Sequence, residues 1–130
     1  MILRLVVVAG VLLVLGSGLA AWRRPSRRLR SGGLAAVGVP GPSVVEFVTE
    51  SCAPCRAVAP RLRQAAAEAR VAFTQIDVGV RPEVARAYGI RTVPTVAVTG
   101  AGGEVLDVWT RIPADDAVAQ AARRARLTRR

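Results

Sequence analysis

The sequence predicts an α/β domain built on a mixed sheet with helices on both faces, preceded by one N-terminal transmembrane helix. Short β-branched runs alternate with helical patterns over residues 43–127, which is typical of a sheet with crossover helices. Before them, residues 5–22 carry no charge over a length close to the ~20 residues that cross a bilayer as a helix. At 130 residues the chain has room for one domain and a short appendage.

Residues 1–22 are predicted to form a single-pass membrane anchor. Five Arg follow within the next eight residues, whereas Arg4 is the only Arg before the apolar run. Because positively charged flanks remain in the cytoplasm, this asymmetry favours a cytoplasmic domain. A cleaved signal peptide and an anchor with the domain outside the cytoplasm are the alternatives.

The formal charge of +10 comes from the two ends of the chain rather than from its centre. All 19 basic residues are Arg, and residues 43–122 hold only 8 of them against 9 acidic residues, a net charge of −1. This distribution argues against a nucleic-acid-binding face. With no His and two Cys, a four-ligand zinc site and a His-based general base are excluded, so we expect neither a metal nor a cofactor.

The elements follow from composition and periodicity. Residues 23–42 are rich in Arg, Gly and Pro and predict a basic linker without a core of its own. The domain begins near Ser43 and is predicted to contain a strand at 44–48, a helix at 53–70, a strand at 71–77, a helix at 82–88, a hairpin at 95–99 and 104–109, and a last helix that starts at Asp115. Residues 128–130 form a basic tail.

Cys52 and Cys55, with Pro54 between them, lie where a strand gives way to a helix. At that position the helix dipole favours a thiolate, and a second Cys one turn further in can resolve a mixed disulfide. The spacing therefore indicates a redox dithiol. An inert structural pair and half of a metal site are the alternatives.

Three segments resemble the thioredoxin family: VEFVTESCAPCRAVAP, QIDV and YGIRTVPTVAV. The resemblance covers residues 43–127 and implies a thioredoxin-like fold, shortened on the N-terminal side of the domain. It departs from the family at Ser51, where Trp is usual, and at Ala53, where Gly is usual.

The resemblance also implies roles for individual residues. Cys52 is the exposed attacking thiol, Cys55 is the buried resolving thiol, and the Val93–Pro94 bond is cis. Val93 and Pro94, together with Ala53 and Pro54, would contact the substrate.

Glu46 stands where the family usually carries a buried Asp, which implies that Glu46 moves the proton of Cys55. Glu is one methylene longer than Asp. The alternative for Glu46 is a solvated residue on an edge strand.

These observations favour a membrane-anchored thiol–disulfide oxidoreductase that works as a reductase. Its substrates would be protein disulfides or sulfenic acids, and its electrons would come from a thioredoxin reductase or a membrane dithiol donor. Cytoplasmic placement favours reduction, since that compartment keeps thiols reduced. The alternatives are an extracytoplasmic thiol reductase of the cytochrome-maturation or disulfide-repair type and a non-catalytic docking module.

Overall fold

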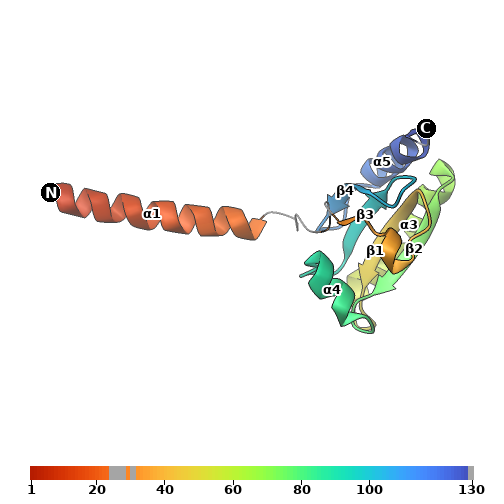
Figure 1. Ribbon diagram of the computed structural model, residues 1–130, viewed down its shortest axis with the longest axis horizontal. Coiled ribbons are helices and arrows are strands. Elements are labelled where there is room, and N and C mark those ends of the chain that lie inside the picture. Colours follow the sequence, from red (N-terminus) through yellow and green to blue (C-terminus); the bar gives the residue numbers. More distant parts are fainter. Residues whose placement is uncertain (24–28, 30–31, 129–130) are drawn as a thin grey trace.

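A computed structural model describes residues 1–23, 29 and 32–128 of the chain. The elements are α1 (Ile2–Arg23), the 3-10 turn η1 (Ala35–Val37), β1 (Ser43–Val48), α3 (Ala53–Ala69), β2 (Ala72–Asp77), α4 (Pro82–Tyr88), β3 (Thr95–Thr99), β4 (Val105–Trp109) and α5 (Asp115–Leu127). Figure 1 shows α1 extending away from the other elements, which gather around one sheet. Most of the predicted Arg cluster and the last two residues of the predicted tail lie outside the described residues.

The sheet has the strand order β2-β1-β3-β4. β1 runs parallel to β2 and antiparallel to β3, and β3 pairs with β4 as an antiparallel hairpin. The predicted α/β fold with a mixed sheet is confirmed, and so is the order of its strands and helices. β1 is therefore a central strand, hydrogen-bonded on both sides.

Alternation along the strands divides the core into two layers, one on each face of the sheet. Helices α3 and α5 cover one face, where they pack on Val44, Val96 and Val98. Helix α4 and the segment around η1 cover the other face, which presents Phe47 and Ala97. Glu46 has the same parity as Val44 on β1, so its side chain belongs to the face covered by α3.

The domain begins earlier than the predicted boundary at residue 43. Leu34 and Val39 are buried in the same core cluster as Phe47, and the Leu34 amide donates to the carbonyl of Gly103 over 2.7 Å. Residues 34–42 therefore contribute side chains to the core of the domain, although they have no core of their own. The sequence did not indicate this contact, because apolar residues outside a helix or strand show no periodicity.

The predicted transmembrane helix coincides with α1. In the part of the chain that the structure describes, no helix combines the length and the apolar character needed to cross a membrane.

Candidate active site

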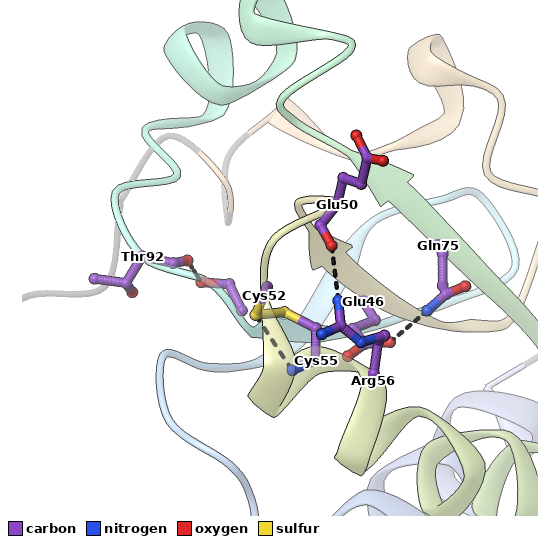
Figure 2. The surroundings of a disulfide bond; sticks show 8 residues. Glu46, Glu50, Cys52, Cys55, Arg56, Gln75 and Thr92 are labelled. Atoms are coloured by element: carbon purple, nitrogen blue, oxygen red, sulfur yellow. Dashed lines mark hydrogen bonds between the residues drawn. A yellow bond between two sulfur atoms is a disulfide. The ribbon is translucent and has the colours of Figure 1, made fainter.

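The two cysteines form a disulfide at the N-terminus of α3 (Figure 2). Cys52 is the N-cap residue, and its sulfur accepts the backbone N–H of Cys55 over 3.2 Å. Pro54 occupies the first turn of the helix, where its missing N–H costs no hydrogen bond. The helix N-terminus thus directs its free N–H groups and its positive dipole end toward the sulfur of Cys52.

Both sulfur-bearing residues are largely covered. Cys52 keeps 7% of its surface exposed and Cys55 keeps 2%. The expectation of an exposed Cys52 is therefore wrong for the disulfide form, although Cys52 is the more accessible of the two. Ala53 and Pro54 are exposed beside it. Ser51, on the other side of Cys52, is exposed as well.

The loop that carries Pro94 lies at the same edge of the sheet as the disulfide. Phe47 on β1 pairs with Thr95 on β3 in an antiparallel register, so the residues after β1 and those before β3 meet at one edge. The Val93–Pro94 peptide bond is cis, the isomer that the resemblance implies. Pro94 is buried and Val93 is half-buried.

Glu46 is fully buried on the central strand β1. Its Oε2 accepts a hydrogen bond from Nε2 of Gln75 over 2.8 Å, whereas Oε1 has no hydrogen-bond partner among the described residues. Burial raises the pKa of Glu46, and this outweighs the opposing effects of the Gln75 hydrogen bond and the positive charge of Arg63. The alternative of a solvated residue on an edge strand is therefore wrong for this position.

Three contacts around the site were not evident from sequence. Gln75 lies directly opposite Glu46 in the parallel register of β1 and β2. Arg56 donates from Nη1 to the carbonyl of Glu50 over 2.7 Å and so ties the loop before the disulfide to the helix after it (Figure 2). The Thr95 hydroxyl donates to the carbonyl of Thr92 over 2.7 Å, which braces the turn around Pro94. Only the strand register could have indicated Gln75.

The arrangement supports two-electron exchange between a dithiol and a disulfide. One sulfur lies at a helix N-terminus, a second lies one turn inward, and a buried carboxyl lies on the strand that leads to them. Within the described ranges, no group of three or more His, Cys, Asp or Glu residues could hold a metal ion.

Comparison with known proteins gives consistent matches. The family model described as Thioredoxin matches residues 37–123. Thioredoxin 1 of Nostoc sp. is 34% identical over 74 residues, which is 55% of this chain and 69% of that protein. The chloroplastic thioredoxin M-type of maize is 32% identical over 74 residues, or 55% of this chain and 44% of that protein. Among solved structures, a point mutant of a thioredoxin from Halobacterium salinarum superposes with a TM-score of 0.59 at 27% identity, covering 66% of this chain and 75% of that one.

Proposed function

The chain belongs to the thioredoxin family and is a thiol–disulfide oxidoreductase, and we propose that it acts as a reductase of protein disulfides and sulfenic acids from the cytoplasmic face of a membrane. The observation that carries this proposal is the Cys52–Cys55 disulfide at the N-terminus of α3, beside the cis bond before Pro94. At this position Cys52 can attack a client disulfide, and Cys55 can resolve the mixed disulfide that forms. A reductant then regenerates the dithiol.

The reaction starts from the reduced pair. The thiolate of Cys52, favoured by the helix dipole, attacks one sulfur of a client disulfide. A bond forms between Cys52 and the client, the client disulfide breaks, and one client sulfur leaves as a thiolate that takes up a proton. The thiolate of Cys55 then attacks Cys52 and releases the second client thiolate. Two electrons have passed from the pair to the client, and the pair has become a disulfide.

Glu46 handles the proton of Cys55 in this scheme. The resolving thiol must lose its proton before it attacks, and a buried thiol has no bulk water to accept it. Burial raises the pKa of Glu46, which makes its carboxylate a better proton acceptor than an ordinary, solvated one. Oε1 has no hydrogen-bond partner among the described residues, so it is available to accept that proton.

The residues around the two sulfurs would contact the substrate. Ala53 and Pro54 are the exposed approach to Cys52, and the backbone of Val93 would pair with an extended client segment as an added strand. The register of β1 and β3 keeps Val93 and Pro94 at the edge of the sheet where the disulfide lies. The electron donor that restores the dithiol would be a thioredoxin reductase or a membrane dithiol carrier.

Membrane attachment through α1 is supported by the sequence and by exposure. Residues 5–22 carry no charge, and the large apolar residues between Ile2 and Leu15 are 51–80% exposed. Five Arg directly after this run favour the cytoplasmic side for the domain. Attaching a reporter after Arg130 that is active only outside the cytoplasm tests the topology. An inactive reporter in the membrane fraction is expected, whereas an active one would favour the extracytoplasmic reductase.

The activity is tested with the reduced full chain and a protein disulfide substrate such as insulin. We expect stoichiometric reduction by the intact chain and none by a Cys52→Ser variant. A chain that binds clients but reduces none of them, with or without a donor, would instead indicate a docking module.

A further inference from the structure

Four loops meet at the edge of the sheet that carries the disulfide. The parallel pair Val48–Asp77 and the antiparallel pairs Phe47–Thr95 and Val96–Trp109 place one end of every strand at this edge. The loops that follow or precede these ends span residues 49–52, 78–81, 90–94 and 110–113. Residues exposed on these loops lie at the edge of the sheet where a client would bind Cys52.

The charged residues of the four loops are predominantly positive. They comprise Arg81, Arg91 and Arg111 against Glu50 alone. Arg81 is engaged, because it pairs with Glu83 and donates to the carbonyl of Val37. Arg91 and Arg111 are exposed, and within the described residues no salt bridge involves either of them.

This positive edge is a local feature and does not reflect the composition of the domain. Residues 43–122 hold 8 Arg against 9 acidic residues, so an excess of Arg in the four loops means an excess of acidic side chains elsewhere on the domain. Arg91 lies two residues before Val93, the predicted client-pairing residue. Arg111 lies two residues beyond Trp109, which pairs with Val96 close to Pro94. Arg91 therefore lies in the cis-Pro loop itself, and Arg111 lies in the loop after β4, the strand that neighbours β3.

We propose that Arg91 and Arg111 select clients whose target cysteine is flanked by acidic residues. This inference rests on the proposed reductase function and names the substrate class of the same site. Exposed charges at the rim of an interface act mainly on the rate of association and on its salt dependence. Potentials of this kind raise association rates by about tenfold or more at low ionic strength.

Three disulfide-bonded peptides test the proposal. They share one target disulfide and differ only in flanks of Asp and Glu, of Ser and Gln, or of Lys and Arg. The second-order rate constant for their reduction is measured with the reduced full chain at low and high salt. We expect the acidic peptide to react about tenfold faster than the basic one at low salt. The ratio should shrink as added salt shortens the Debye length from about 10 Å at 0.1 M to about 3 Å at 1 M.

Two charge-matched double variants show where the attraction originates. Arg91→Gln with Arg111→Gln should bring the ratio of rates close to one. Arg86→Gln with Arg123→Gln removes two exposed Arg from α4 and α5 and should leave the ratio unchanged.

The possible results distinguish the acidic-client proposal from the proposed reductase function. Equal rates for all three peptides, or a preference that survives loss of Arg91 and Arg111, would overturn the acidic-client proposal and leave the reductase intact. Failure to reduce any of the three peptides would overturn the reductase function and the proposal together.

Discussion

Replacing Glu46 by Leu should make the protein more stable at neutral pH and a poorer catalyst. Burial raises the pKa of Glu46, so the folded state binds this proton more tightly than the unfolded state does. The resulting stabilisation is complete in acid, below the unfolded pKa, and is lost as the pH rises through the raised folded pKa. Leu fills a similar volume and carries no charge, so the variant avoids this loss.

The size of the effect follows from the contacts of Glu46. The substitution removes one hydrogen bond to a carboxylate, from the exposed Gln75, which is worth about 1.5–3 kcal/mol. It also removes a fully buried carboxyl whose Oε1 has no partner among the described residues, and the desolvation of such an ion costs several kcal/mol. The expected net gain is about 1–3 kcal/mol at pH 7.5, or roughly 5–20 °C in Tm for a domain of this size.

Urea and thermal unfolding of the oxidised protein between pH 4.5 and 7.5 measures this difference without titrating thiols. The advantage of the variant should grow with pH. Glu68→Leu, which changes an exposed carboxyl on α3, serves as the control and should shift stability by no more than about 0.5 kcal/mol. In the reduced protein, Glu46→Leu should slow resolution by Cys55 about a hundredfold and leave the first attack by Cys52 unchanged. A variant that is less stable than the parent at pH 7.5, or that resolves at the parent rate, would refute the reasoning.

Three further predictions concern the dithiol and the N-terminal part of the domain. A Cys55→Ser variant should accumulate a mixed disulfide between Cys52 and a client, visible on non-reducing gels; rapid turnover without an adduct would contradict the assigned order of attack. Leu34→Ala should lower the free energy of unfolding by about 2–5 kcal/mol. Val80 is exposed, so Val80→Ala should change this free energy by less than about 0.5 kcal/mol. Equal effects of the two substitutions in denaturant titrations would show that residues 34–42 do not contribute to the core. Gly103→Ala should cost about 1–3 kcal/mol, because Gly103 has a φ of +80° and an added Cβ would lie 2.8 Å from the backbone of η1; an unchanged Tm would show that η1 can move aside.

Most of the fold was predictable because its elements carry strong local signals. Helix α4 lies between Pro82 in its first turn and Gly89, whose φ of +65° ends it, and both limits were predicted from those two residues. Strand β3 was predicted to the residue from its β-branched run. Where such signals are absent, prediction failed: Leu34 and Val39 are buried by an irregular segment that composition alone describes as a linker.

The site was predictable only in its sequence-local part. Cys52, Pro54 and Cys55 are adjacent in the chain, so their place at the start of a helix could be read from the spacing. The cis state of the bond before Pro94 was predicted from the family resemblance alone, because few X–Pro bonds are cis and the local sequence does not indicate which ones. The contact between Gln75 and Glu46 was not predictable, because it depends on the register of two parallel strands whose paired residues are 29 positions apart in the chain.

A redox titration of the full chain in glutathione buffers, with thiol alkylation reporting the state of Cys52 and Cys55, tests the proposed reductase most directly. If the chain is a reductase, the reduction potential of the Cys52–Cys55 pair should be about −270 mV, which is below the cytosolic glutathione potential of roughly −220 to −260 mV. A potential above about −180 mV would mean that the pair donates disulfides rather than reducing them. A pair that never closes in any buffer would contradict dithiol chemistry altogether.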